Sequence, residues 1–126
     1  MAQGYEQRQS AVPTKRYVQY LEISDNPALL AEYRKWHSEA YHWKEIRDGI
    51  RAVGILEMEI YLTGNHLTMI VDVPADFDWQ KAMNQLADQP RQAEWEAFVA
   101  KFQNCVADAR SDEKWTPMER IFRLYE

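Results

Sequence analysis

ILEMEIYLTGNHLTMIVDV, residues 55–73, is the stretch that best predicts the fold of this chain. Within residues 55–62, apolar side chains alternate strictly with others: Leu56, Met58, Ile60 and Leu62 against Glu57, Glu59 and Tyr61. This alternation is typical of a strand with one buried face, because successive side chains point to opposite faces of a sheet. Residues 66–73 form a second such run, and the TGN between the two runs contains a glycine. The stretch therefore predicts a β-hairpin.

A strand and a helix are predicted before the hairpin. RYVQYLEI, residues 16–23, alternates well enough for a strand. A helix is expected to begin after SDNP, because Asp25 or Asn26 can cap a helix and Pro27 fits its first turn. Leu30, Tyr33, Trp36 and His37 then share one side of this helix, which is expected to run to about Ile50.

A second helix and a last strand are predicted after the hairpin. Residues 77–108 are typical of a helix that is interrupted near Pro90. SDEK, residues 111–114, is expected to be a loop. Residues 115–125 predict a strand in which Pro117 restricts pairing near the start. Two of the aromatic residues in this last stretch, Trp115 and Phe122, are expected in the core.

The predicted order β-α-β-β-α-β indicates an α+β class, a ferredoxin-like βαββαβ sandwich with its helices on one face of the sheet. The other sheet face has to be covered, and a second copy of the chain is the simplest cover. We therefore expect a homodimer of the dimeric α+β barrel type. Residues 1–15 are polar and are expected to form an N-terminal tail, and residues 16–126 a single domain.

Composition excludes several classes of partner. The chain has 126 residues, of which 46% are hydrophobic and 28% charged, and its net charge is −5. An acidic chain argues against binding to nucleic acid or to an anionic membrane surface. A lone cysteine, Cys105, predicts a reduced thiol and a cytoplasmic location, and no secretory signal or membrane-spanning run is visible.

AEYRKWHSEAYHWKEI, residues 31–46, holds the best candidates for chemistry. Tyr33 and His37 are one helical turn apart and can line one pocket, where an imidazole can exchange protons near neutral pH. The alternative is that this histidine is only packed among aromatic rings. His37 and His42 are five residues apart, about 140° around a helix, which disfavours a metal site, and His42 is given no role. Glu57 and Glu59 are interpreted as a solvated or dimer-facing side of a strand.

Four segments together resemble the L-rhamnose mutarotase family, including its relatives that act on L-fucose. They are AEYRKWH (31–37), GILEMEIYLTGNHLTMIVDV (54–73), QAEWEAF (92–98) and EKWTPMERIFRL (113–124). The resemblance covers roughly residues 16–124, and the order and spacing of the segments carry it. Members of that family are dimeric ferredoxin-like proteins that interconvert the α and β anomers of a 6-deoxyhexose without a cofactor.

The resemblance also implies roles for particular residues. His37, in the Tyr-x-x-x-His pattern of the family, would be the proton donor, and Tyr33 would contact the sugar. Trp95 matches a tryptophan that lines the pocket, and Trp43 and Tyr61 are the other residues expected to bind the monosaccharide. The identity of the general base that would work with His37 is left open: Tyr33, Tyr61, a carboxylate or a water could fill that role.

Three departures from the family pattern bear on the sugar. Met58 stands where rhamnose enzymes typically have a tyrosine, and Glu94 precedes Trp95 where they have a second tryptophan. The Trp-Pro-Glu segment of the family is represented by Trp43-Lys44-Glu45, two residues further from His37. The Met-Glu-Ile-Tyr strand and the Glu-Trp helix favour the L-fucose branch. Two other functions stay open: a non-catalytic small-molecule-binding or regulatory domain, and a monooxygenase on the same architecture.

Overall fold

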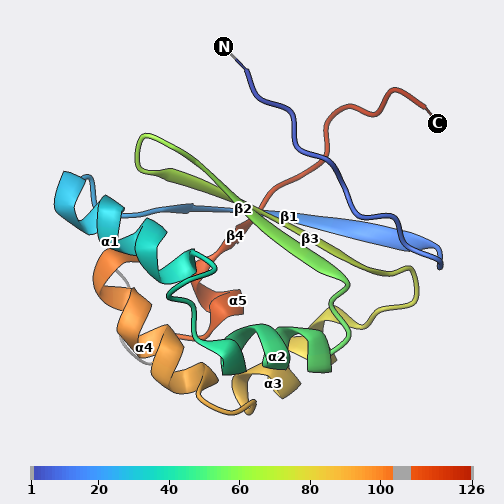
Figure 1. The fold of residues 1–126 in the computed structure, drawn as a ribbon. Helices are drawn as coiled ribbons and strands as arrows, with labels where there is room; N and C mark the ends of the chain where they lie inside the picture. Colours follow the sequence, from blue (N-terminus) through green and yellow to red (C-terminus); the bar gives the residue numbers. More distant parts are fainter. Residues whose placement is uncertain (1, 104–108, 126) are drawn as a thin grey trace.

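The structure is a computed structural model that describes residues 2–103 and 109–125. The elements along the chain are β1 (Thr14–Glu22), α1 (Pro27–His37), α2 (Lys44–Ala52), β2 (Glu57–Thr63), β3 (His66–Pro74), α3 (Trp79–Ala87), α4 (Gln92–Gln103), α5 (Ser111–Lys114) and β4 (Thr116–Pro117). The strands form one antiparallel sheet in the order β2-β3-β1-β4. The helices lie on one side of this sheet, and both termini extend on the other side (Figure 1). The predicted ferredoxin-like α+β fold is confirmed.

The hairpin predicted from residues 55–73 is present as β2 and β3. Its two-residue turn is Gly64-Asn65, and Gly64 has a φ of +58°, a conformation that glycine adopts without strain. The side-chain amide of Asn65 donates to the carbonyl of Ile23 at 2.9 Å, and the amide of Ile23 donates back to the carbonyl of Asn65. The turn is therefore tied to the end of β1.

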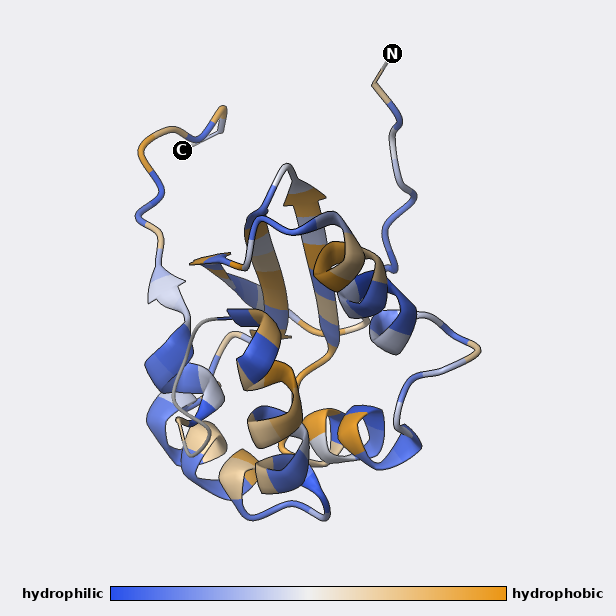
Figure 2. Ribbon diagram, turned by 90° about the vertical axis from the view of Figure 1, so that its left-hand side faces the viewer, coloured by the Kyte–Doolittle hydropathy of each residue, from blue (hydrophilic) through white to orange (hydrophobic). Residues whose placement is uncertain are grey.

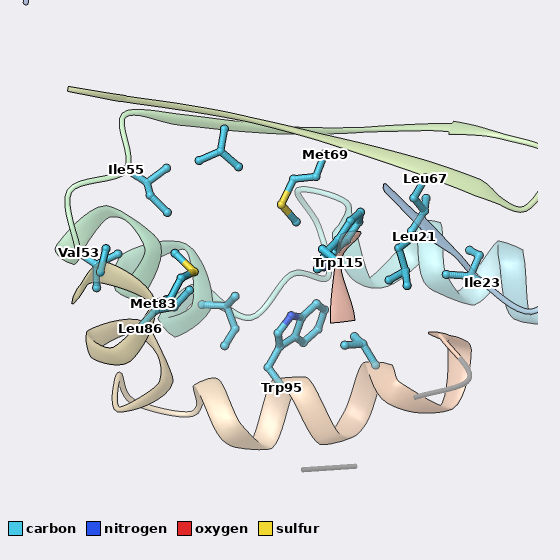
Figure 3. Packing of buried hydrophobic residues seen from close by; sticks show 14 of the residues in the cluster. Leu21, Ile23, Val53, Ile55, Leu67, Met69, Met83, Leu86, Trp95 and Trp115 are labelled. Carbon is cyan, nitrogen blue, oxygen red and sulfur yellow. The ribbon is translucent and has the colours of Figure 1, made fainter. Parts of the chain in front are cut away.

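The alternation in the hairpin separates an inner face from an outer face of the sheet. Leu67, Met69, Val71 and Val73 of β3 are buried on the inner face, and residues of β2 such as Met58 pair with them. Figure 3 shows Trp95 on α4 pointing toward Met69 and Trp115. The core thus lies between the sheet and the helices, as a sheet with one buried face requires.

The first helix begins as predicted but ends much earlier. Asn26 caps α1, because its side-chain oxygen accepts from the amides of Ala28 and Leu29. The prediction of one helix as far as Ile50 is wrong. The chain leaves the helix at Ser38, whose backbone is extended and whose hydroxyl donates to the carbonyl of Lys35 at 2.6 Å. Residues 38–43 contain no glycine or proline, so nothing local marks this break.

The predicted interruption near Pro90 is confirmed as the boundary between α3 and α4. Asp78 caps α3 by accepting from the amide of Lys81 at 3.1 Å. Arg91, the residue before α4, has a φ of +62°. A left-handed conformation is uncommon for a residue with a side chain, so the contacts of Arg91 have to hold it there. The end of the predicted helix, residues 104–108, lies outside the described residues, as does Cys105.

The C-terminal region differs from the prediction in three respects. The segment 111–114 is not a loop but the single helical turn α5, which the Glu113 carboxylate stabilises by accepting from the amide of Arg110 at 2.8 Å. The strand predicted over 115–125 is wrong beyond Pro117: β4 consists of Thr116 and Pro117, and after it only the amide of Met118 donates to β1, to the carbonyl of Val18 at 2.8 Å, among the described residues. Trp115 is buried as expected, whereas Phe122 is 75% exposed and not in the core. Figure 2 shows this C-terminal segment, with its hydrophobic residues, projecting away from the domain.

None of the helices among the described residues is long and apolar enough to cross a membrane.

The role of the inner sheet face can be tested at Val71, which is fully buried on the central part of β3. Val71→Ala should lower the free energy of unfolding by about 2 kcal/mol or more, since each buried CH₂ contributes about 0.8 kcal/mol and the cavity left behind adds to the loss. Urea denaturation measures this. Val12→Ala, at a position that is 48% exposed, is the control and should change stability by less than about 0.5 kcal/mol. Equal effects of the two substitutions would contradict the assignment of the core.

Candidate active site

A cavity of about 320 Å³ lies between the sheet and the helices α1, α2 and α4. This volume is within the range of small-molecule sites. Its walls include aromatic side chains, apolar residues of β2 and β3, and a few polar groups. The residues that matter below are Tyr33, His37, His42, Trp43, Met58, Met69, Gln92, Trp95, Glu96 and Trp115.

Tyr33 and His37 form the centre of the aromatic wall, as their helical spacing predicts. The two rings stack with their centroids 4.2 Å apart and an interplanar angle of 15°. Tyr33 is buried, its ring packs edge-on against Phe102, and its hydroxyl accepts from the amide of Gln103 at 3.2 Å. The tyrosine therefore both belongs to the core and lines the cavity.

The hydrogen bond of His37 determines its tautomer. Nδ1 of His37 lies 2.7 Å from the backbone carbonyl of Tyr33. A carbonyl oxygen can only accept, so Nδ1 carries the proton in this bond. In the neutral ring Nε2 is then the unprotonated nitrogen, which is able to take up a proton.

Burial lowers the pKa of His37 below its ordinary value of 6.5. The carbonyl of Tyr33 acts in the opposite direction, and the positive charge of Arg47 lowers the pKa further. Burial dominates, so the neutral ring is the favoured form at neutral pH. His37 is thus placed to accept a proton first and to return it later.

Trp43 and Trp95 complete the aromatic wall. The Trp95 ring lies edge-on to His37 with the centroids 5.3 Å apart, and edge-on to Trp43 at 5.1 Å. Trp43 also packs against Phe98 of α4. Because Trp43 is the residue just before α2, these contacts give a physical reason for the break in the helix after His37: a continuous helix would carry Trp43 away from α4.

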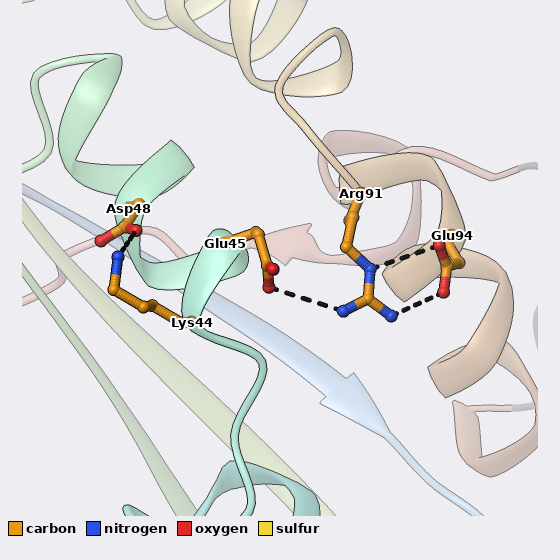
Figure 4. Close-up of polar contacts among 5 residues, drawn as sticks. All are labelled: Lys44, Glu45, Asp48, Arg91 and Glu94. Atoms are coloured by element: carbon orange, nitrogen blue, oxygen red, sulfur yellow. Dashed lines mark hydrogen bonds and ion pairs between the residues drawn. The ribbon is translucent and has the colours of Figure 1, made fainter.

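Arg91 holds Trp43 from the outside. Its guanidinium lies 4.1 Å from the centre of the Trp43 ring and makes ion pairs with Glu94 at 2.7 Å and Glu45 at 3.5 Å. Figure 4 shows this guanidinium between the two carboxylates, one on α2 and one on α4. A planar cation that stacks on an indole and pairs with carboxylates at its edge is well suited to fix a ring. The same contacts account for the left-handed backbone of Arg91.

The structure brings four of the five expected site residues together: Tyr33, His37, Trp43 and Trp95. Tyr61 is not among the residues that line the cavity. It lies on the outer face of the sheet, where its hydroxyl donates to Glu59 and its ring contacts Tyr5 edge-on. His42 does line the cavity, and its buried Nδ1 has no hydrogen-bond partner among the described residues.

Within the part of the chain that the structure describes, no group of three or more His, Cys, Asp or Glu side chains could hold a metal ion.

Sequence reasoning missed the polar side chains that α4 contributes. Gln92 and Glu96 are both buried and line the cavity beside Trp95. Their spacing of four residues puts them on one face of the helix. That spacing, on the side of the helix that also carries Trp95 and Val99, is the signal that could have identified them.

Comparison with known proteins identifies the family. The model of a family described as L-rhamnose mutarotase matches residues 16–124. The chain is 34% identical over 112 residues to an L-fucose mutarotase of Xanthomonas campestris, covering 89% of this chain and 90% of the relative. It is 32% identical over 101 residues to an L-rhamnose mutarotase of Burkholderia cenocepacia, covering 79% and 89%.

The chain belongs to the L-rhamnose mutarotase family. Its fold is also similar to the crystal structure of an L-rhamnose mutarotase from Formosa agariphila, with a TM-score of 0.65 and 18% identity over 87% of this chain and 98% of the other. The resemblance found in the sequence is thereby confirmed, and with it the expectation of a carbohydrate isomerase that interconverts sugar anomers.

The protonation state of His37 can be tested by titration. Burial lowers its pKa, so its ring resonances in NMR spectra should titrate with a midpoint below 6.5. A folded pKa below the unfolded one means that the unfolded chain binds more protons. The contribution of His37 to stability should therefore be complete above pH 6.5 and lost as the pH falls toward its folded pKa. His37→Gln identifies the resonances, and a midpoint at or above 6.5 would contradict the burial described here.

Proposed function

We propose that this protein interconverts the α and β anomers of a 6-deoxyhexose, with His37 as a proton-transfer group. The observation that carries the proposal is the pairing of a neutral imidazole, its tautomer fixed by the carbonyl of Tyr33, with a cavity walled by aromatic rings. Membership of the mutarotase family supports it.

Mutarotation requires protons to move at two neighbouring oxygens. The anomeric hydroxyl loses its proton while the ring oxygen gains one, the bond between C1 and the ring oxygen breaks, and an open-chain aldehyde forms. Rotation about the C1–C2 bond exposes the other face of the carbonyl, and closure returns both protons. Nε2 of His37 is the acceptor on opening and the donor on closure, so the same nitrogen serves both directions of the reaction.

Tyr33, Trp43 and Trp95 bind the sugar in this proposal. Indole faces offer flat apolar surfaces for the C–H groups and the methyl group of a 6-deoxyhexose, and the Tyr33 ring, stacked on His37, sets the position of the imidazole. Tyr61 is left out of the pocket, because it lies on the opposite face of the sheet.

L-Fucose is the proposed substrate, with L-rhamnose as the alternative. Met58 lines the cavity at the position where rhamnose enzymes typically have a tyrosine, so one polar contact to the sugar is replaced by an apolar one. The similarity to an L-fucose mutarotase supports this choice.

We also propose that the protein is a homodimer of single domains that begin near residue 16. The outer face of the sheet carries half-buried apolar side chains such as Val18 and Ile70. The C-terminal segment exposes five large hydrophobic residues: Met118, Ile121, Phe122, Leu124 and Tyr125. Exposed apolar groups of this number are typical of a surface that a partner covers.

The cytoplasmic location expected from the sequence stays a prediction.

The activity is tested by saturation-transfer proton NMR on the anomeric signals of L-fucose and L-rhamnose. The protein should accelerate exchange, and His37→Gln should reduce the acceleration by about 10²–10⁴-fold, the usual contribution of a positioned acid or base. His66→Gln, on the outer face of the sheet, is the matched control and should retain the acceleration. No acceleration of either sugar by the wild-type protein would favour a non-catalytic small-molecule-binding domain.

The dimer is tested by light scattering coupled to size-exclusion chromatography. The expected mass is twice the 15.0 kDa of one chain. The double substitution Ile121→Ser and Phe122→Ser should shift the protein toward the monomer, because it removes the two adjacent exposed hydrophobic side chains. Tyr41→Ser removes a large exposed side chain near the cavity and should leave the mass unchanged. A wild-type protein that elutes as a monomer at high micromolar concentration would rule the dimer out.

A further inference from the structure

A second titratable side chain, Glu96 of α4, lines the same cavity as His37. It follows Trp95, whose ring contacts His37. The residue is only 8% exposed, although an ionised carboxylate is rarely buried unless it has a partner or a function. None of the roles described above uses it.

Lys114 of α5 fixes one side of this carboxyl group. Its Nζ is fully buried, donates to the backbone carbonyl of Glu96 at 2.7 Å and lies 3.4 Å from Oε1 of the same residue. The other oxygen, Oε2, is also buried and has no hydrogen-bond partner among the described residues. Oε1 of the neighbouring Gln92 is in the same situation. Lys114 therefore holds the carboxyl group from one side, and the residue borders the cavity on the other.

Burial raises the pKa of Glu96 above its ordinary value of 4.5. The charge and hydrogen bond of Lys114 and the amide of Gln92 lower it, whereas the negative charge of Asp112 raises it. Burial dominates, so the carboxyl group keeps its proton to a higher pH than a solvated one. The other titratable or charged side chains that line the cavity are Arg8, Tyr33, His37, His42, Arg47, Arg51 and Glu57. Among these, Arg47 lowers the pKa of His37.

We propose that Glu96 is the second catalytic residue, the proton-transfer partner of His37. Its protonated Oε2 donates to the ring oxygen of the sugar while Nε2 of His37 removes the proton of the anomeric hydroxyl. The bond between C1 and the ring oxygen breaks, its electron pair stays on that oxygen, and the C1–O1 bond becomes a carbonyl. Closure reverses both transfers, so neither residue is changed after one cycle. This inference rests on the proposed function and supplies the acid that the His37 mechanism needs.

The pairing predicts how activity depends on pH. The reaction needs His37 without a proton and Glu96 with one, so the pH profile should be bell-shaped. Activity should fall at low pH because His37 becomes protonated, and at high pH because Glu96 loses its proton. Replacing either residue by glutamine, which does not titrate, should remove one limb and leave the other.

The test is anomer-exchange NMR on wild-type protein and on Glu96→Gln, with exchange rates measured over a range of sugar concentrations and pH. Glutamine has nearly the same shape as glutamate and can still accept from Lys114, so the fold should be retained. The substitution should lower kcat by about 10²–10⁴-fold with little change in KM, and should remove one limb of the pH profile. Glu32→Gln is the matched control, because Glu32 is exposed and does not line the cavity.

Two results would overturn the proposal. The first is a Glu96→Gln variant that keeps the wild-type kcat and pH profile, or that only raises KM, since either outcome would reduce Glu96 to a binding or structural role. The second is a wild-type profile with a single limb, which decides the question even if the variant does not fold. Failure of the proposed function is a different result, namely wild-type protein that accelerates neither sugar.

Discussion

The antiparallel pairing of β1 with β3 is the constraint on which the rest of the structure depends. The ladder runs over all nine residues of each strand and joins the two central strands of the sheet. Because the side-chain period of a strand is two, this register directs Met69 and Val71 toward the helices along with the rest of the inner face. Met69 then forms part of the cavity wall and packs toward Trp95. A shift by one residue would put these side chains on the outer face and leave α4 without a surface to cover.

The same apolar environment acts in opposite directions on His37 and Glu96, two of the titratable groups that line the cavity. Burial disfavours any charged form, so it lowers the pKa of His37 and raises the pKa of Glu96. Both groups are thereby shifted toward their neutral forms, one able to accept a proton and the other able to donate one. Aromatic rings supply much of this environment around His37, and Arg91 holds one of them, Trp43, in place.

Sequence reasoning predicted the elements whose side chains obey a simple period. The hairpin, the cap of α1 at Asn26 and the break near Pro90 all carry local signals, and the structure has each of them. Tyr33 and His37 meet because one helical turn separates them. The alternation in β2 also places Tyr61 beside Glu59, away from the core, and the structure agrees with that alternation rather than with the expected sugar contact. The C-terminal strand was overestimated, because an apolar sequence pattern does not show whether a neighbouring strand is there to pair with it.

The sequence by itself determined the type and order of the main elements, the sheet face that is buried and the proximity of Tyr33 to His37. These depend on neighbours one to four residues apart, which a sequence displays directly. Only the tertiary structure decided where α1 ends, which way Trp43 turns, and that Lys114 reaches Glu96 across 18 residues of chain. Those features follow from contacts between separate helices. The periodicity of apolar residues in a sequence shows which side of a helix is covered, but it does not show which side chain covers it.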